Sequence, residues 1–463
     1  MSALWTSAEA EAATLGTASR AFEATGISID TRTLKPGDLF VALQGEARDG
    51  HEFVRAAFEA GATAALVSKT PGDLPADAAL LTVAHTQRGL EDLGRAARAR
   101  SHGKMIAVTG SAGKTTTKEL LRLACGALGR THASAASYNN HWGVPLSLAA
   151  MPRDSEYGVI EIGTNHFGEI RGLVDFARPH VALVTTIAPA HLEFFGSAEA
   201  IADAKSEIFE HIVPGGAAAI PSDNPHAERL ALRAKQAGLS TILRFGAKTG
   251  SDARLIAREE AGEGQTIKAD VLGHAVHIHV GAPGAHIAQN AVGALLAVAA
   301  ADGDVFNAAA ALSQFSALKG RGAQFRVRVG EGRATVIDES YNANPASMAA
   351  ALALLGSARA SGRRIAVLGD MLEMGPDGAA HHSALAEFIE AARVDLVFAN
   401  GAQMKALWDR LPASRRGAYG ATSAEIAPAV AAALAAGDVV LVKGSLGSKM
   451  AVVIEALKGR GAQ

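Results

Sequence analysis

Short apolar runs rich in β-branched residues alternate with helical patterns along almost the whole chain. Alternation at this spacing is typical of parallel α/β layers. No fixed period separates the runs, which favours several different α/β units over a solenoid. The runs that we expect to be buried strands are Leu39 to Leu43, Lys104 to Thr109, Tyr157 to Ile162, Val181 to Thr186, Thr335 to Asp338, Arg364 to Leu368, Val394 to Ala399 and Val439 to Lys443.

The chain of 463 residues is long enough for roughly three domains, at about 150 residues per domain. Two junctions suggest where they meet. A basic helical pattern ends at Ala99 to Gly103, just before a new strand, and Ser316 to Gly322 follows two alanine-rich helices. We therefore expect domains at 1–100, 101–315 and 316–463.

Charge and hydropathy exclude two classes of partner. Lys plus Arg number 44 and Asp plus Glu number 46, so the chain lacks the positive field that nucleic-acid binding requires. The longest apolar stretches, such as Ala291 to Ala301, reach about half a membrane span. The first residues do not resemble a secretory signal, and the single cysteine, Cys125, cannot form an intrachain disulfide. We expect a soluble, cytoplasmic protein without nucleic-acid or membrane partners.

A phosphate-binding loop follows the strand Met105 to Thr109. Glycines let backbone N–H groups turn toward phosphate oxygens, the Lys114 ammonium reaches the β and γ oxygens, and the Thr115 hydroxyl can ligate Mg²⁺. Val108 stands where the longer P-loop pattern has glycine, so only the form Gly-x-x-Gly-Lys-Thr is met; a glycine turn with a solvated lysine is the alternative. The loop leads into a helix expected to begin near Lys118, and its nucleotide-binding residues are Gly110, Ser111, Ala112, Gly113, Lys114, Thr115 and Thr116.

Two more polar side chains follow predicted strands. Glu161 ends one strand and His191 follows the next, and in a parallel sheet these ends share one edge. Glu161 is a candidate Mg²⁺ ligand, although a strand-end glutamate can also be simply solvated. His191 is open to both interpretations, because magnesium prefers oxygen and a loop histidine is often only hydrogen-bonded.

Lys205 lies in the middle of an apolar helical stripe with Ile201, Ile208 and Ile212. We expect it to point inward. A snorkelling lysine would explain the position, but the nearby phosphate edge also allows a chemical role.

With these residues the chain resembles the Mur ligases, the ATP-dependent amide ligases that build the peptide stem of peptidoglycan. The resemblance spans nearly the whole chain, and Tyr341 to Pro345 and Gly369 to Glu373 are its parts most specific to the member that adds D-alanyl-D-alanine. The segments that carry it are Ser28 to Arg32, Pro36 to Phe40, Asp49 to His51, Gly110 to Thr117, Tyr138 to Leu146, Ala190 to Glu193, Lys205 to Phe209, Asp338 to Pro345 and Leu368 to Gly375.

The resemblance implies an N-terminal domain for a uridine nucleotide, a central P-loop-type ATPase domain and a C-terminal Rossmann-like domain that closes over the nucleotide. It assigns catalysis to Lys114, Lys205, His191 and Arg321, with Arg321 as a γ-phosphate clamp. It assigns ATP contacts to Asn290, Asp338 and Tyr341, metal ligation to Thr115, Glu161, His191 and Lys205, and substrate contacts to Ser28, Asp30, Thr31, Arg32, Asn139, Asn140, Asn342 and Asn344. Taken singly, Asn290 could be a satisfied helix asparagine, Asp338 a turn acid and Arg321 a linker charge.

The activity implied is ligation of D-alanyl-D-alanine to a UDP-N-acetylmuramoyl tripeptide through an acyl phosphate, with ATP and Mg²⁺ and by a monomer. A carbamate on Lys205 is expected, because burial lowers the pKa of the ammonium and leaves a neutral amine to react with CO₂. Two rivals are a folylpolyglutamate synthase, which would lack the opening at Ser28 to Arg32, and a P-loop switch or motor that forms no small product.

The last motif departs from the family pattern. The segment Lys443 to Ala451 begins Lys-Gly-Ser, but Leu446 and Ala451 stand where many relatives carry arginine and glutamate, which leaves its substrate contacts in doubt. Glu339 replaces a common aspartate, a change that we expect to matter little.

Overall fold

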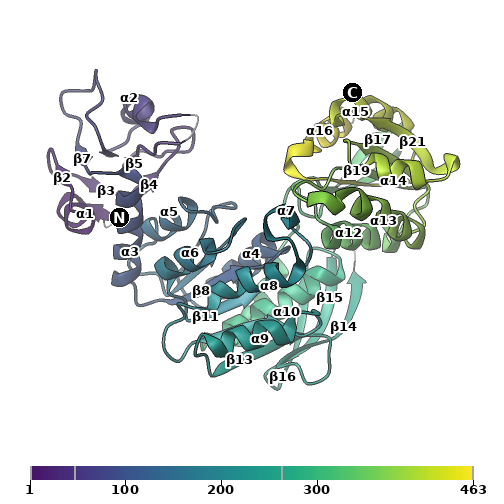
Figure 1. The fold of residues 1–463 in the computed structure, drawn as a ribbon, viewed down its shortest axis with the longest axis horizontal. Helices are drawn as coiled ribbons and strands as arrows, with labels where there is room; N and C mark the ends of the chain where they lie inside the picture. Colours follow the sequence, from purple (N-terminus) through teal and green to yellow (C-terminus); the bar gives the residue numbers. More distant parts are fainter. Residues whose placement is uncertain (1–2, 46–47, 262–263, 461–463) are drawn as a thin grey trace.

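The structure, a computed structural model, describes residues 3–45, 48–261 and 264–460. Three α/β domains follow one another along the chain and form a V in projection, with the central domain at its base (Figure 1). The predicted three-domain α/β architecture is confirmed. Within the described residues, no helix combines the length and the apolar character needed to cross a membrane.

The N-terminal domain contains a five-stranded sheet in the order β2-β7-β6-β5-β4, with a two-stranded ribbon of β1 and β3 beside it. Helix α3 (Thr86–Arg100) packs Leu90 and Leu93 against the sheet residues Leu39 and Leu66. The strands are β1 (Trp5–Thr6), β2 (Thr17–Ala18), β3 (Glu23–Ala24), β4 (Gly26–Ser28), β5 (Asp38–Val41), β6 (Ala64–Val67) and β7 (Leu80–Thr82), and the other helices are α1 (Ser7–Thr14), the 3-10 turn η1 (Gly50–Phe53) and α2 (Val54–Glu59).

The central domain contains a nine-stranded sheet in the order β16-β15-β14-β13-β12-β11-β8-β10-β9. Its parallel strands are β8 (Lys104–Thr109), β9 (Thr131–Ala133), β10 (Tyr157–Glu161), β11 (Val181–Val184), β12 (Ala217–Pro221) and β13 (Thr241–Gly246). The helices are α4 (Lys114–Gly126), α5 (Gly143–Ala149), α6 (Glu169–Ala177), α7 (Leu192–Phe195), α8 (Ala198–Ser206), α9 (Ala227–Gln236), α10 (Ala285–Ala300) and α11 (Val305–Ala311), with 3-10 turns η2 (Glu207–Phe209) and η3 (Leu312–Gln314).

The expectation of parallel layers alone is wrong at one edge of this sheet. Strand β14 (Ala253–Ala261) still pairs parallel with β13, but β15 (Gly264–Val271) and β16 (His274–Val280) extend it with antiparallel pairings. In β15, Ile267 and Ala269 are buried while Lys268 between them is exposed. Alternation of this kind suits a sheet with one wet face, which antiparallel pairing permits.

The C-terminal domain contains a six-stranded sheet in the order β17-β18-β22-β19-β20-β21, parallel except for the antiparallel pair β17 and β18. The strands are β17 (Ala323–Val329), β18 (Gly332–Glu339), β19 (Arg364–Gly369), β20 (Leu396–Asn400), β21 (Arg416–Gly420) and β22 (Val439–Lys443). The helices are α12 (Pro345–Ser357), α13 (Gly378–Ala391), α14 (Lys405–Arg410), α15 (Ser423–Ala433) and α16 (Ala451–Arg460), with 3-10 turns η4 (Gly375–Asp377), η5 (Ala413–Arg415) and η6 (Leu446–Ser448).

The expected domain junctions fall between regular elements. The boundary at residues 100 and 101 lies between α3 and β8, and the boundary at 315 and 316 lies between η3 and β17. That these two junctions separate independently folding domains stays a prediction.

Candidate functional site

The glycine loop after β8 presents the N-terminus of helix α4. This helix begins at Lys114, so the predicted start near Lys118 is wrong and Thr115 lies in the first turn. Gly113 caps the helix with φ of 80°, a left-handed conformation that favours glycine. A Cβ at this position would stand 2.8 Å from the Asn290 side chain of α10. The free N–H groups of the first turn make this loop an anion site.

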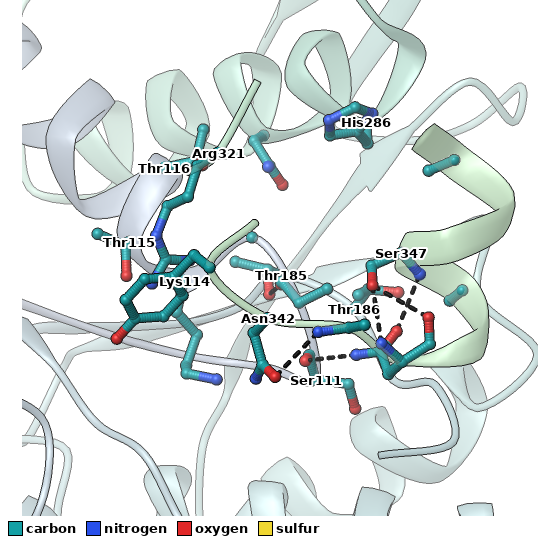
Figure 2. A pocket seen from close by; sticks show the side chains of 18 of the residues that line it. Ser111, Lys114, Thr115, Thr116, Thr185, Thr186, His286, Arg321, Asn342 and Ser347 are labelled. Carbon is teal, nitrogen blue, oxygen red and sulfur yellow. Dashed lines mark hydrogen bonds between the residues drawn. The ribbon is translucent and has the colours of Figure 1, made fainter. Parts of the chain in front are cut away.

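A cavity of about 390 Å³ opens over this loop, between the central and C-terminal domains (Figure 2). Residues of α4, of the strand ends and of α10 form one side, and residues of the 320–347 segment form the other. The predicted site residues that line it are Ser111, Ala112, Gly113, Lys114, Thr115, Thr116, Asn139, Glu161, His191, Asn290, Arg321, Tyr341, Asn342 and Asn344.

The other predicted residues do not line the cavity. Ser28, Asp30, Thr31 and Arg32 lie in the N-terminal domain, where Arg32 Nε donates to both oxygens of Asp30 at 2.9 and 3.1 Å. Gly110, Asn140, Asp338 and Lys205 lie outside the lining as well.

Asp338 makes hydrogen bonds within its own turn, and its predicted ATP contact stays a prediction. Its carboxylate accepts hydrogen bonds from the Gly320 N–H at 3.0 Å and from the Ser340 N–H and hydroxyl at 3.1 and 2.6 Å. The side chain is buried, and these bonds connect the end of β18 to the turn that carries Arg321. Asp338 therefore holds the turn that carries Arg321.

Arg321 reaches the cavity from the C-terminal side. Its guanidinium lies 3.8 Å from the ring centroid of Tyr341, and its Nη2 donates to the Ser137 hydroxyl at 3.2 Å. Ser137 also lies 3.4 Å from the Thr115 hydroxyl. These contacts place a cation opposite the phosphate loop, as a clamp on a phosphate would require.

Several lining residues were missed by the sequence reasoning. Ser137 gives no signal beyond its place before the Tyr138 to Leu146 motif. His286 lies four residues before Asn290 on α10, and this spacing could have indicated a shared helix face. Burial lowers the pKa of His286. The remaining missed residues with polar side chains are Thr164, Asn165, Thr185, Thr186, Gln289, Glu339, Ser347 and Lys443.

The divergent segment contributes its first residue to the cavity. Lys443 is buried, and its ammonium donates to Glu339 at 3.2 Å and to the Asn342 carbonyl at 2.9 Å. Leu446 and Ala451 are exposed. The pairing with Lys443 explains why an acid is needed at position 339, and glutamate meets that need.

Glu161 fits the part of a metal ligand. Its Oε1 accepts a hydrogen bond from Asn139 at 2.7 Å, whereas its Oε2 is buried and has no partner among the residues that the structure describes. A buried carboxylate oxygen without a donor calls for a cation. The described part of the chain holds no cluster of three or more His, Cys, Asp and Glu side chains, so a metal ion held here would need at least one ligand of another type.

Lys205 is buried as expected, with 1% of its surface exposed. Helix α8 ends at Ser206 and the apolar stripe continues through η2, so the stripe is not one continuous helix. Burial holds the pKa of Lys205 well below its usual range, and the Lys114 ammonium lowers it further. Burial also lowers the pKa of His191, which Glu373 opposes and which Lys114 and Lys205 reinforce.

Comparison with known proteins places the whole chain in one family. Family models match residues 23–123 (Mur ligase family, catalytic domain), 108–298 (Mur ligase middle domain) and 325–446 (Mur ligase, glutamate ligase domain). A UDP-N-acetylmuramoyl-tripeptide--D-alanyl-D-alanine ligase of Rickettsia prowazekii is 33% identical over 93% of this chain and 94% of its own.

Solved structures agree. MurF from Acinetobacter baumannii superposes with a TM-score of 0.84 at 30% identity, covering 98% of this chain and 99% of its own. MurF ligase from Thermotoga maritima in complex with ADP gives a TM-score of 0.77 at 25% identity, covering 94% of this chain and 98% of its own. The chain belongs to the Mur ligase family.

Proposed function

We propose that this enzyme joins D-alanyl-D-alanine to a UDP-N-acetylmuramoyl tripeptide with ATP and Mg²⁺, yielding the pentapeptide precursor of peptidoglycan. One observation carries the proposal. Lys114 of the central domain and Arg321 of the C-terminal domain line the same cavity as the unpartnered Glu161 oxygen. This arrangement suits phosphoryl transfer from a nucleotide, and the protein acts in the cytoplasm as a monomer under this proposal.

The reaction has two steps. The terminal carboxylate of the tripeptide attacks the γ-phosphate, so that ADP leaves and an acyl phosphate forms. The amine of D-alanyl-D-alanine then attacks the acyl carbon, the carbon–oxygen bond breaks, and inorganic phosphate leaves. Lys114 and Arg321 offset the charge of the two anions, and the cavity limits access of water to the acyl phosphate.

Mg²⁺ would be held by Glu161, Thr115 and His191, where it would neutralise phosphate charge. A carbamate on Lys205 belongs to the same proposal. A neutral, buried amine beside Lys114 can react with CO₂ to form a carbamate. This anion would supply hard oxygen ligands for Mg²⁺, whereas a protonated Lys205 would repel the metal ion.

The substrate that carries the reacting carboxylate is long, and its other end needs a binding site away from the cavity. We assign the uridine nucleotide to the N-terminal domain around Ser28, Asp30, Thr31 and Arg32, and the peptide part to Asn139, Asn140, Asn342 and Asn344. Asn290 and Tyr341 would contact ATP.

Phosphate release tests the reaction. We expect release from ATP to require both the UDP-muramoyl tripeptide and D-alanyl-D-alanine. A nucleotide-driven switch would instead release phosphate without them.

Lys114→Ala should reduce turnover by at least about 100-fold with the fold intact, because the ammonium stabilises charge that develops in phosphoryl transfer. Ligation at the wild-type rate by a folded Lys114→Ala protein would contradict the assignment.

A further inference from the structure

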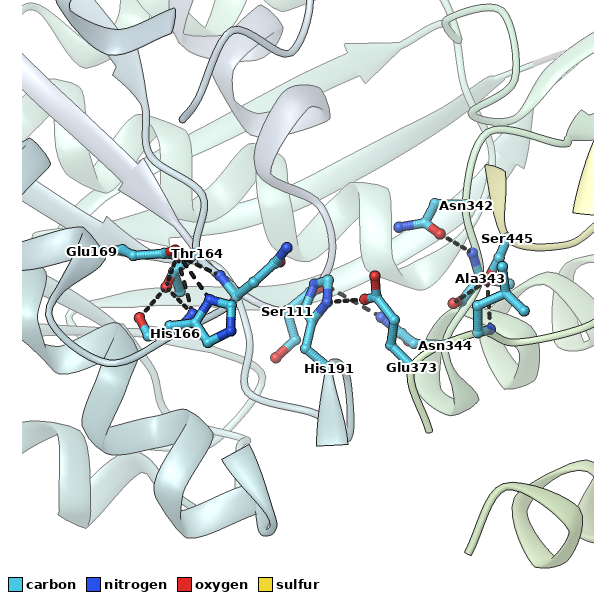
Figure 3. Close-up of polar contacts among 12 residues, drawn as sticks. Ser111, Thr164, His166, Glu169, His191, Asn342, Ala343, Asn344, Glu373 and Ser445 are labelled. Carbon is cyan, nitrogen blue, oxygen red and sulfur yellow. Dashed lines mark hydrogen bonds and ion pairs between the residues drawn. The ribbon is translucent and has the colours of Figure 1, made fainter. Parts of the chain in front are cut away.

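The loop that carries His191 contacts the C-terminal domain directly. His191 follows β11, and its Nδ1 is hydrogen-bonded to Oε2 of Glu373, which follows β19 (Figure 3). The Glu193 N–H donates to the Glu373 carbonyl at 3.2 Å. The two residues are 182 positions apart in the chain, so this pair joins two domains.

Both partners have an unusual backbone. His191 has φ of 55° and Glu373 has φ of 61°, which is the left-handed region that non-glycine residues rarely adopt. Strained residues of this kind persist where the surrounding structure fixes them, and they cluster at functional sites. Gly375, with φ of 65°, lies beside the Glu193 backbone and allows the two loops to approach.

Apolar packing supports the same contact. Leu192 packs against a hydrophobic core of the central domain and also against one of the C-terminal domain. The residue next to His191 is therefore fixed by both domains. The conformation of the histidine loop then depends on where the 370–375 loop lies.

We propose that Glu373 is a positioning residue that the C-terminal domain supplies to His191. A carboxylate only accepts hydrogen bonds, so Nδ1 must carry the proton, which leaves the Nε2 lone pair for a metal ion. Carboxylate partners fix the tautomer and the ring orientation of metal-binding histidines in this way. The inference rests on the proposed function, because it assumes that His191 is a ligand.

The placement of Glu373 couples metal binding to domain docking. When the 370–375 loop leaves the central domain, His191 loses its hydrogen-bond partner and its orientation. The metal site would then be complete only while the C-terminal domain covers the cavity. ATP would be activated only with the domains together, which protects it from unproductive hydrolysis.

The test measures Mn²⁺ as the probe, bound to the whole protein with ADP and followed by electron paramagnetic resonance. His191→Gln identifies the signal that arises from this histidine nitrogen. We expect Glu373→Ala to weaken Mn²⁺ binding at that site by at least about 10-fold. Glu373→Asp keeps the charge but shortens the reach, so it should weaken binding as well. The matched control is Glu193→Ala, which removes an exposed carboxylate from the same loop but keeps its backbone hydrogen bond to Glu373, and it should change binding by less than about 2-fold.

Small-angle X-ray scattering with ADP shows whether the domains stay together. It therefore distinguishes the loss of His191 positioning from a loss of domain docking. Mn²⁺ binding and a histidine signal equal to wild type in Glu373→Ala and Glu373→Asp would overturn the proposal, even if scattering showed looser domains. If Glu373→Ala does not fold, Glu373→Asp alone decides. Absence of ADP-dependent Mn²⁺ binding in the wild type would count against the proposed function itself, so the two failures are distinguishable.

Discussion

Lys205 is the side chain whose chemistry depends most on its surroundings. It is buried, and burial together with the nearby Lys114 ammonium lowers its pKa. We predict that Lys205→Ala reduces turnover by at least about 100-fold, because a carboxylate-like metal ligand is lost. Acetate or formate in the assay should restore part of the activity, since a small carboxylate can take the place of the proposed carbamate.

The control for this experiment is Lys235→Ala, which removes an exposed lysine of α9. It should turn over at the wild-type rate with or without acetate. Full activity of Lys205→Ala without any added carboxylate would refute the carbamate.

Sequence reasoning at this scale succeeded where spacing alone sets the environment. The inward direction of Lys205 followed from its helical period, and Lys114 followed from the glycine loop. Glu373 gave no such signal, because its partner His191 lies 182 positions away and only the fold brings them together. Asp338 shows another limit, since a motif gives no indication that its aspartate also bonds to the Gly320 and Ser340 backbone.

The turn before η1 connects strands β5 and β6 through a chain of hydrogen bonds. Asp49 accepts from the His51 ring at 2.6 Å and from the Lys69 ammonium at 2.7 Å, and the His51 Nε2 accepts from the Ser68 N–H at 2.9 Å. The hydrogen bond from Lys69 and the His51 backbone N–H hold the pKa of Asp49 well below its usual range.

A lowered pKa stabilises the fold above the unfolded-state pKa, about 3.9, and this stabilisation is lost as pH falls below it. We therefore predict that Asp49→Asn lowers the urea midpoint of the N-terminal domain at pH 7, and that the difference from wild type narrows between pH 5 and pH 3. Asp77→Asn, at an exposed position of the same domain, should show no such narrowing. A difference that is constant with pH would show that the charge of Asp49 does not stabilise this turn.

Whole helices and strands, like single residues, could be predicted only where the local sequence pattern determines their environment. Strands such as β8 and β22 are continuous apolar runs rich in β-branched residues and were expected, whereas the equally buried but alanine-rich β6 and β12 were missed. The β14 to β16 extension was not expected either, because exposed residues interrupt its apolar ones. Helix α4 begins earlier than expected, since Thr115 to Thr117 are poor helix formers that the loop geometry overrides.

The joint between the N-terminal and central domains contains hydrogen bonds from side chains to backbone carbonyls. Trp5 donates to the Ala149 carbonyl at 2.8 Å, and the buried Arg98 donates at 2.7 Å to each of the Ala177 and Arg178 carbonyls at the end of α6. Burial lowers the pKa of Arg98 to about 10. A cation at a helix C-terminus satisfies carbonyls that lack partners in the helix.

We predict that Arg98→Ala lowers the free energy of unfolding by about 2 kcal/mol, because these carbonyls lose a charged donor in a buried place. Urea unfolding followed by tryptophan fluorescence measures it. Arg88→Ala removes an exposed arginine of the same helix and should stay within about 0.5 kcal/mol of wild type. Equal effects of the two substitutions would show that Arg98 does not hold this joint.

The division of labour among the domains can be followed in the intact protein. We predict that UDP slows amide hydrogen exchange around Ser28 to Arg32, whereas ADP slows it around Gly110 to Thr117. Ligand contacts order the backbone that they touch, and local opening then becomes rarer. Protection by UDP confined to Gly110 to Thr117 would contradict the assignment of the N-terminal domain.

The floor of the cavity and its roof belong to different domains. Asn344, at the start of α12, donates from the roof to the Ser111 carbonyl of the glycine loop at 3.1 Å. Release of a product from the cavity would require that this hydrogen bond breaks and that the C-terminal domain moves away through solvent. Solvent viscosity opposes such a motion, so the rate of domain opening would set the turnover rate. A more viscous medium would then lower turnover and leave the rates of the chemical steps unchanged.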